Sequence, residues 1–172
     1  METVYLLLGS NLGNSIEIMK LAILQIEKRI GNILSKSSYY ETEPWGFSHE
    51  QQFINQVICI ETTLLPFDLL NKLFDIENEL GRVRSNKDGY EARIIDIDIL
   101  FYGSLIIDEL NLQIPHPRMH LRKFTLIPLA EINNNLLHPV LNKTTKELLD
   151  ICEDTLVVKK IIEKNLFQLC FY

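Results

Sequence analysis

The sequence predicts an α+β fold, in which an antiparallel sheet with packed helices is followed by a C-terminal extension. Short segments rich in β-branched residues alternate with two segments of helical periodicity in the order βαββαβ, and a glycine closes each helical segment. Two β-α-β halves in this order pack as a ferredoxin-like core with the helices on one face of the sheet. The 172 residues, 47% of them hydrophobic, predict a single domain over residues 1–172.

The first half of this core has well-marked boundaries. A buried strand over residues 4–8 leads into the polar segment 9–14. Asn14 then caps a helix, with Glu17 in capping-box register, and Gly31 ends it. The segment 9–14 lies where phosphate-binding loops occur, but it lacks their lysine, so an ordinary strand-to-helix turn is the simpler interpretation.

The remaining elements follow from the same signals. Further strands are expected over residues 33–40, 53–62, 93–101 and 105–107. Pro66 begins a second helix that Gly81 ends, and a short helix begins after Thr144. Residues 156–172 match no element, but 166–172 are apolar enough that we expect them to pack on the domain or on a second copy.

Two carboxylates interrupt the apolar strand that ends at Phe101. Because strand side chains alternate, Asp96 and Asp98 point the same way, about 7 Å apart at Cα. Ile97, Ile99 and Phe101 then point to the other face, as does Ile95. Two like charges on a half-buried surface need a partner, and Mg²⁺ suits carboxylate oxygens. The alternative is an edge strand with a solvated polar face.

A basic segment runs directly into this acidic strand. Residues 81–93 carry four basic side chains, including Arg82, Arg84 and Arg93. Carboxylates that hold Mg²⁺ beside several arginines are the equipment of phosphoryl transfer. The alternative is that the arginines pair with the aspartates.

Other polar residues occupy apolar positions. Glu77 lies on the apolar face of the second helix, where it either binds a ligand or anchors an arginine. Asn55 lies between apolar strand residues and is either a structural amide or a group that recognises a flat heterocycle. Aromatic residues for stacking such a ring are available at Trp45, Phe53 and Phe124.

Composition narrows the class of partner. The net charge of −6 and the pI near 5.2 argue against nucleic acid, and no apolar run is long enough to span a membrane. The N-terminus lacks the features of a signal peptide, so we expect a cytoplasmic protein. Cys59, Cys152 and Cys170 are widely spaced and are expected to be reduced thiols.

With these residues in place, the chain resembles the 6-hydroxymethyl-7,8-dihydropterin pyrophosphokinases of folate biosynthesis. The resemblance covers roughly residues 3–132. Its motifs are G-S-N-L-G-N at 9–14, F-I-N-Q-V at 53–57, I-E with L-G-R-V-R at 76–84, R-I-I-D-I-D-I-L at 93–100 and I-P-H-P-R-M at 114–119. The chain departs from the family at Phe74, where Gln is frequent, and at Tyr90, where Trp is frequent.

The resemblance implies transfer of the β,γ-pyrophosphoryl group of ATP to the hydroxymethyl oxygen of the pterin, with release of AMP. It implies two Mg²⁺ ions at Asp96 and Asp98, and a catalytic action of Arg82 and Arg93 on the phosphates. The implied ATP-binding residues are Glu77, Arg84, Arg93, Ile99, His116 and Arg122. The implied pterin-binding residues are Thr42, Pro44, Trp45, Phe53, Asn55 and Phe124.

Two other functions compete with this one. A different two-metal nucleotidyl or phosphoryl transferase would keep the paired aspartates without needing the aromatic residues around Asn55. A non-enzymatic ligand-sensing domain of ferredoxin-like topology would need neither Mg²⁺ nor ATP cleavage. For the pyrophosphokinase we expect a monomer whose partners are the small molecules ATP and hydroxymethyl-dihydropterin.

Overall fold

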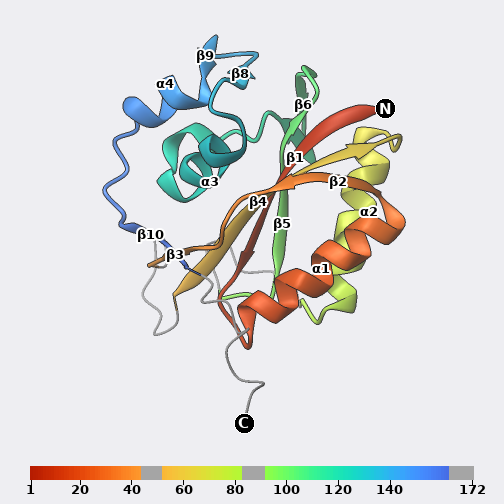
Figure 1. Ribbon diagram of the computed structural model, residues 1–172. Helices are drawn as coiled ribbons and strands as arrows, with labels where there is room; N and C mark the ends of the chain where they lie inside the picture. The colour runs from red at the N-terminus through yellow and green to blue at the C-terminus, as the bar shows by residue number, and fades with distance from the viewer. Residues whose placement is uncertain (44–51, 83–91, 163–172) are drawn as a thin grey trace, which may run out of the picture.

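The computed structural model describes residues 1–43, 52–82 and 92–162 (Figure 1). The strands of the main sheet are β1 (Glu2–Ser10), β2 (Gly31–Lys36), β3 (Tyr40–Thr42), β4 (Phe53–Thr62), β5 (Asp96–Tyr102) and β10 (Val158–Lys160). The helices are α1 (Ser15–Arg29), α2 (Pro66–Glu79), α3 (Lys123–Asn133) and α4 (Thr145–Asp150), with a 3-10 turn, η1, at Met119–Leu121. Two small hairpins pair β6 (Ile107–Glu109) with β7 (Leu112–Ile114), and β8 (Leu137–His138) with β9 (Lys143–Thr144).

The main sheet is antiparallel throughout, as the sequence predicts. Its strands follow the order β10-β3-β4-β1-β5, and β2 also pairs with β4. The first and last strands of the βαββαβ segment, β1 and β5, are therefore neighbours, with β5 at one edge of the sheet and β1 between β5 and β4.

The two helices of the βαββαβ segment share one face of this sheet, as expected, and two later helices cover the other face. α1 and α2 lie on one side, over a core that includes Leu6, Leu8 and Ile60 (Figure 1). α3 and α4 lie on the other side, over a second core that includes Leu7 and Val57. Alternate residues of β1 enter different cores, as strand geometry requires. The sequence pattern missed α3, because Pro128 lies inside this helix and its amphipathic periodicity is weak.

Local signals explain where the helices begin and end. The Asn14 side chain accepts a hydrogen bond from the Glu17 backbone N–H at 3.5 Å, at the start of α1. Gly81 follows α2 with a φ of +96°, a conformation that favours glycine. Thr144 and Glu147 form a complete capping box on α4. The helix signals at Asn14, Gly81 and Thr144 are thus confirmed.

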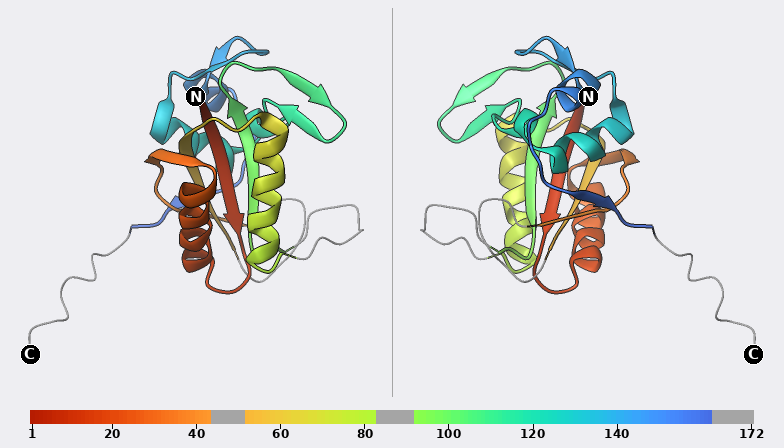
Figure 2. Two further views of the ribbon diagram at one scale, coloured as in Figure 1. Left: turned by 90° about the vertical axis from the view of Figure 1, so that its right-hand side faces the viewer. Right: turned by 90° about the vertical axis from the view of Figure 1, so that its left-hand side faces the viewer.

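Several strand boundaries differ from the expectation. The expected strand over 33–40 is two strands, β2 and β3, because the chain breaks at 37–39, where Ser37 bonds to Val57. The acidic strand begins at Asp96, after residues 93–95, which lie outside the ladder. The expected strand over 105–107 is mostly irregular, and β6 pairs only with β7 in a hairpin that projects from the main sheet (Figure 2).

A β-bulge interrupts β5 and corrects the expected facing of Phe101. Tyr5 pairs with Phe101 and Leu6 pairs with Ile99, so Leu100 is the extra residue. Ile97 and Ile99 enter the core under α1 and α2, but Phe101 enters the core under α3. There its ring meets that of Tyr5 edge-on, at a centroid distance of 6.2 Å.

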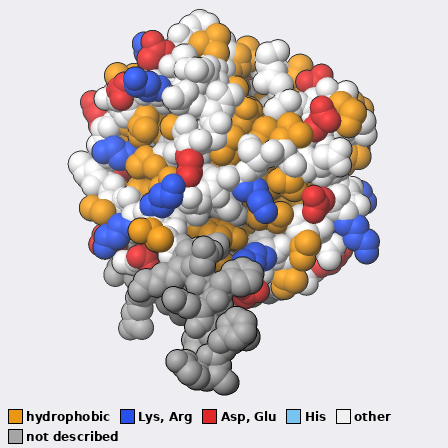
Figure 3. Space-filling view, viewed as in Figure 1, with side chains coloured by type: hydrophobic (Ala, Val, Ile, Leu, Met, Phe, Trp, Pro, Cys, Tyr) orange, Lys and Arg blue, Asp and Glu red, His pale blue; other side chains and the backbone are white. Residues whose placement is uncertain are grey.

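The surface and the chain end complete the description. On the face in Figure 3, acidic and basic side chains are interspersed. Among the described residues, no helix combines the length and the apolar character needed to cross a membrane. Cys59 is buried and Cys152 partly buried, and both are free thiols, as expected. Residues 158–160 pair with β3, whereas the expected packing of 166–172 and the thiol of Cys170 lie outside the described residues.

Candidate active site

A cleft lies at one end of the main sheet. It has a volume of about 410 Å³ and is bordered by β1, β4, β5, α2, β7 and the first turn of α3. The side chains that line it include most of the predicted site residues: Thr42, Phe53, Asn55, Glu77, Arg82, Arg93, Asp96, Asp98, Ile99, His116, Arg122 and Phe124. Residues that are up to 82 positions apart in the sequence thus meet in one site, as Thr42 and Phe124 do.

Three adjacent strands carry the floor of the cleft. Asn55 of β4 pairs with Gly9 of β1, and Gly9 pairs on its other side with Asp96 of β5. Directly opposed residues in antiparallel strands share a face, so Asn55 and Asp96 point into the cleft about 10 Å apart, two strand spacings. Gly9 leaves the space between them open, since a Cβ there would meet Asn55 Oδ1 at 3.4 Å.

The two aspartates have different surroundings. Asp96 forms ion pairs with Arg82 and Arg93, so the alternative in which arginines pair with an aspartate is realised at this carboxylate. Asp98 has no ion pair with a described residue. Burial, followed by the negative charge of Asp96, raises the pKa of Asp98 to about 7, although Arg93 opposes the shift. Asp98 is therefore the carboxylate of the pair that most needs a positive charge.

Glu77 anchors an arginine, one of its two predicted roles. Its side chain is 1% exposed and accepts hydrogen bonds from Arg82 Nη1 at 2.6 Å and from the Ile97 backbone N–H at 2.7 Å. Arg82 in turn reaches Asp96, so Glu77 fixes both the guanidinium and the start of β5. A buried carboxylate with two strong donors is a stable arrangement.

Contacts within the protein account for the polar residue Asn11 in segment 9–14, without a bound phosphate. Asn11, which is 2% exposed, accepts a hydrogen bond from the Arg93 N–H at 2.7 Å, and its own N–H donates to the Arg93 carbonyl at 3.0 Å. The turn between β1 and α1 therefore holds Arg93 beside Asp96. The sequence analysis missed this role, because a turn asparagine gives no sign of a partner 82 positions away.

Aromatic residues border the other side of the cleft. We call the group formed by Thr42, Phe53, Asn55 and Phe124 the aromatic slot. The Asn55 amide donates to the Thr42 hydroxyl at 3.0 Å, which fixes the orientation of both side chains. Arg93 lies over the Phe53 ring at 5.9 Å, a cation-π contact that joins the slot to the charged part of the cleft.

A second basic group lies across the cleft. The His116 N–H donates to the Leu100 carbonyl at 3.0 Å, which places this residue against β5. Burial, followed by the charges of Arg122 and Arg118, lowers the pKa of His116 to about 4, so its imidazole is neutral near pH 7. Arg122 is 5% exposed and lies 5.5 Å from the Phe124 ring.

Four residues that the sequence analysis related to the site lie outside the described residues, and several residues that line the cleft were not predicted. These four are Pro44, Trp45, Arg84 and Tyr90. The structure adds cleft-lining residues that sequence reasoning missed, from α2 and the β6–β7 hairpin: Leu70, Asn111, Leu112 and Gln113. Phe74, which the sequence marked only as a departure from the family pattern, also lines the cleft.

The donor set is compatible with magnesium. No group of three or more His, Cys, Asp or Glu side chains that could hold a metal occurs in the described part of the chain. Mg²⁺ is commonly bound through one or two carboxylates together with substrate phosphates, so a pair of aspartates is sufficient. The raised pKa of Asp98 also marks a carboxylate that a cation would stabilise.

Comparison with known proteins decides the family. The family model of 7,8-dihydro-6-hydroxymethylpterin-pyrophosphokinase matches residues 5–134. The chain belongs to this family. The matched range agrees closely with the stretch over which the sequence motifs were found.

Relatives within the pyrophosphokinase family are similar over most of their length. The 2-amino-4-hydroxy-6-hydroxymethyldihydropteridine pyrophosphokinase of Aquifex aeolicus is 42% identical over 147 residues, 86% of this chain and 90% of that protein. The protein of the same name from Haemophilus influenzae is 39% identical over 154 residues, 87% of this chain and 95% of that one.

A solved structure has the same fold. Wild-type HPPK-DHPS of Plasmodium falciparum superposes with a TM-score of 0.72 at 19% identity. The superposition covers 87% of this chain but 44% of the longer Plasmodium chain. At this identity the likeness concerns the fold alone, and it agrees with an α+β architecture.

Proposed function

We propose that this chain transfers the β,γ-pyrophosphoryl group of ATP to 6-hydroxymethyl-7,8-dihydropterin, a step of folate biosynthesis. Membership of the pyrophosphokinase family makes the chain an ATP-dependent diphosphotransferase. The observation that supports this function best is the row Asn55–Gly9–Asp96 on the cleft floor. It presents a group suited to a heterocycle and a carboxylate suited to phosphate-bound cations on one face, about 10 Å apart.

The phosphates of ATP would occupy the charged end of the cleft. Asp96 and Asp98 would hold two Mg²⁺ ions, which would neutralise the phosphates and polarise the reacting group. The guanidiniums of Arg82 and Arg93 both lie at Asp96. Each would exchange its contact with this carboxylate for one with the phosphate oxygens bound beside it. Glu77 and Asn11 would keep these two arginines in place.

The rest of the nucleotide would lie between β5, α2 and the β6–β7 hairpin. Ile99, Phe74 and Leu112 give this part of the cleft an apolar lining that suits a base. The neutral imidazole of His116 and the buried guanidinium of Arg122 would bind phosphate or ribose oxygens. Arg84 is proposed as a further ATP contact from the sequence.

The pterin would occupy the aromatic slot. Its ring would stack between Phe53 and Phe124, while the amide of Asn55 recognises the donors and acceptors at the ring edge. Thr42 would hold that amide in its orientation. Pro44 and Trp45 are proposed as further pterin contacts from the sequence.

Catalysis would then require positioning and charge stabilisation rather than a protein nucleophile. The hydroxymethyl oxygen attacks the β-phosphorus, a new oxygen–phosphorus bond forms, and the bond to the AMP oxygen breaks. Arg82 and Arg93 would counter the charge that develops on the phosphate oxygens. Holding the two substrates on one sheet face supplies the orientation that such an in-line transfer needs.

Product analysis tests this function directly. The protein is incubated with ATP and Mg²⁺, with and without 6-hydroxymethyl-7,8-dihydropterin, and the nucleotides are separated. Pterin-dependent AMP together with a pterin diphosphate is the expected result. ADP, or turnover that does not depend on the pterin, would contradict the proposal and favour a different phosphoryl transferase.

Other properties are proposed on weaker grounds. The strand order β5-β1-β4, with β2 and β3 beyond β4, supports a ferredoxin-like arrangement of the βαββαβ segment. From the sequence we also propose a single domain over residues 1–172, a monomer, a cytoplasmic location and no nucleic-acid partner.

A further inference from the structure

One carboxylate outside the cleft binds an unusual number of donors. Glu131, near the end of α3, accepts hydrogen bonds from the Ser38 backbone N–H and the Ser38 hydroxyl, each at 2.9 Å. It also accepts from the Tyr40 hydroxyl at 2.9 Å and from Lys160 Nζ at 2.7 Å. The Glu131 side chain is 29% exposed, so these contacts are partly shielded from water.

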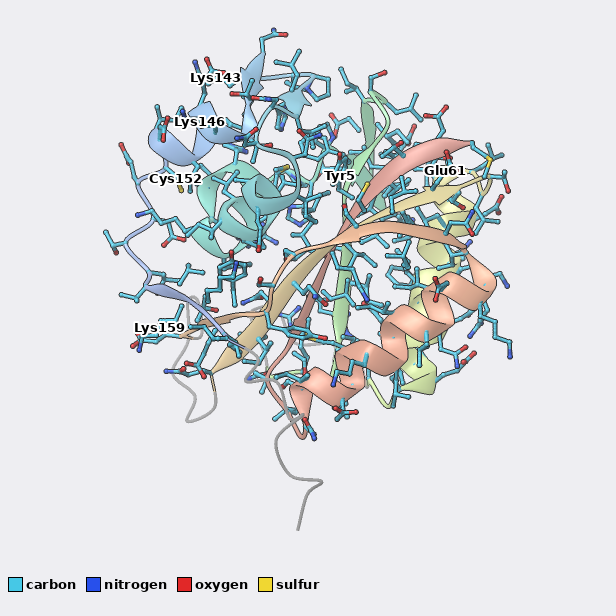
Figure 4. The ribbon with its side chains drawn as sticks, in the orientation of Figure 1. Tyr5, Glu61, Lys143, Lys146, Cys152 and Lys159 are labelled. Carbon is cyan, nitrogen blue, oxygen red and sulfur yellow. The ribbon has the colours of Figure 1, made fainter. Side chains whose placement is uncertain are left out.

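These four contacts join three separate parts of the chain. Tyr40 belongs to β3, Lys160 belongs to β10, and Glu131 itself belongs to α3. Figure 4 shows β10, marked by Lys159, alongside β3 at the sheet edge. The pairing of Lys160 with Tyr40 and the hydrogen bond from the Ile161 N–H to the Tyr39 carbonyl secure this edge.

Two of the elements that Glu131 joins, α3 and β3, also carry residues of the aromatic slot. Phe124 precedes Glu131 by seven residues, two turns of α3, so both lie on the same side of this helix. On β3, Tyr40 is directly opposite Asn55, and Thr42 follows it on the same face. Glu131 therefore ties the helix that carries Phe124 to the strand that carries Thr42.

The chemistry of the contacts requires a carboxylate. The Ser38 N–H and the Lys160 ammonium are donors without acceptor capacity, so each needs an oxygen of Glu131. A glutamine would present an NH₂ group to one of these two donors and lose that bond. Burial opposes ionisation, but the hydrogen bonds from Lys160 and Ser38 outweigh it and lower the pKa of Glu131 to about 2, so the carboxylate is charged near pH 7.

We propose that Glu131 is a positioning residue for the pterin, because it fixes the separation between Phe124 and the Thr42–Asn55 pair. It touches no substrate and acts through α3 and β3. This role rests on the proposed binding of the pterin in the aromatic slot. The charged end of the cleft, with Arg82 and Asp96, is built on α2 and β5 and has no bond to Glu131.

The test compares two glutamates in matched settings. Glu131→Gln removes the carboxylate described here, and Glu147→Gln removes one on α4 that likewise accepts a backbone N–H and a hydroxyl, both from Thr144. For Glu131→Gln we expect the KM for the pterin to rise about tenfold, while the KM for ATP and kcat stay within about threefold, since loosening the slot misplaces one substrate. Glu147→Gln is expected to leave all three constants within about twofold.

Several outcomes would overturn this role. An unchanged pterin KM in folded Glu131→Gln, or equal losses for both substrates, would make Glu131 a purely structural residue. If Glu131→Gln does not fold, Tyr40→Phe removes one bond and keeps the ring; the proposal then requires a rise in pterin KM of at least about twofold. Wild-type protein without pterin-dependent AMP would instead contradict the proposed function, which separates the two failures.

Discussion

Replacement of Glu77 by glutamine gives a sharp test of how the site is held together. Arg82 and the Ile97 N–H both donate to Oε1 of Glu77, so the amide oxygen of Glu77→Gln can still accept from both, but the negative charge that pairs with Arg82 is lost. Removing one partner of a buried ion pair costs about 3–5 kcal/mol. Arg82 is 16% exposed and keeps Asp96, so we expect the free energy of unfolding to fall by about 2–3 kcal/mol.

Glu79 provides the matched control on the same helix. It also pairs with an arginine, Arg29, at 2.7 Å, but its side chain is 56% exposed. Exposed pairs contribute about 0–1 kcal/mol, so Glu79→Gln is expected to cost less than about 1 kcal/mol. Urea unfolding followed by circular dichroism measures both variants against the wild type. Equal losses for the two variants would refute the reasoning that burial makes the Glu77 pair important.

Three further predictions concern the cleft. Asp98→Ala should lower pterin-dependent AMP release at least about 100-fold through loss of a metal ligand, and near-normal turnover would count against the proposed metal site. Asn11→Ala leaves the Arg93 N–H without its acceptor and should cost about 1–3 kcal/mol in urea unfolding, together with lower turnover; wild-type stability would contradict this. The pKa of His116 is lowered to about 4 from an ordinary 6.5, so between these values the unfolded chain binds more protons. Stability should therefore rise as the pH increases from about 4 to about 6.5, by up to about 3 kcal/mol, and His116→Asn should remove that part of the slope. An NMR titration of His116 with a midpoint near pH 6.5 would contradict it.

The sequence predicted those parts of the fold that depend on local signals. The Asn14 cap, the Pro66 start and the Gly81 end of the helices are all confirmed, since each depends on neighbouring residues. The pattern failed where tertiary contacts decide. Ser37 bonds to Val57 across the sheet and breaks an otherwise continuous strand, and α3 packs on the second face despite its internal proline.

The candidate site was predictable to a similar extent. The paired aspartates and the misplaced carboxylate of Glu77 could be found because a charge in an apolar pattern demands a partner. Asn55 was found as a polar residue in an apolar strand and Phe53 and Phe124 as candidate stacking rings, the family resemblance related them to a pterin, and the cleft brings them together. Leu112 and Gln113 could not be found, because nothing local indicates that the β6–β7 hairpin borders the cleft.

The bulge at Leu100 has a consequence for how this strand tolerates sequence change. Before the bulge, β5 points Asp96 and Asp98 into the cleft, and beyond it Phe101 fills the core on that same side. Deletion of Leu100 would restore regular alternation, in which Ile99 and Phe101 still point to opposite sides, so the aspartates and the aromatic ring would keep their side and the loss would be the buried Leu100 side chain in the core under α3. The facing of Asp98 and Phe101 therefore does not depend on the bulge residue, and a single-codon deletion at Leu100 would lower stability through lost packing before it changed the cleft.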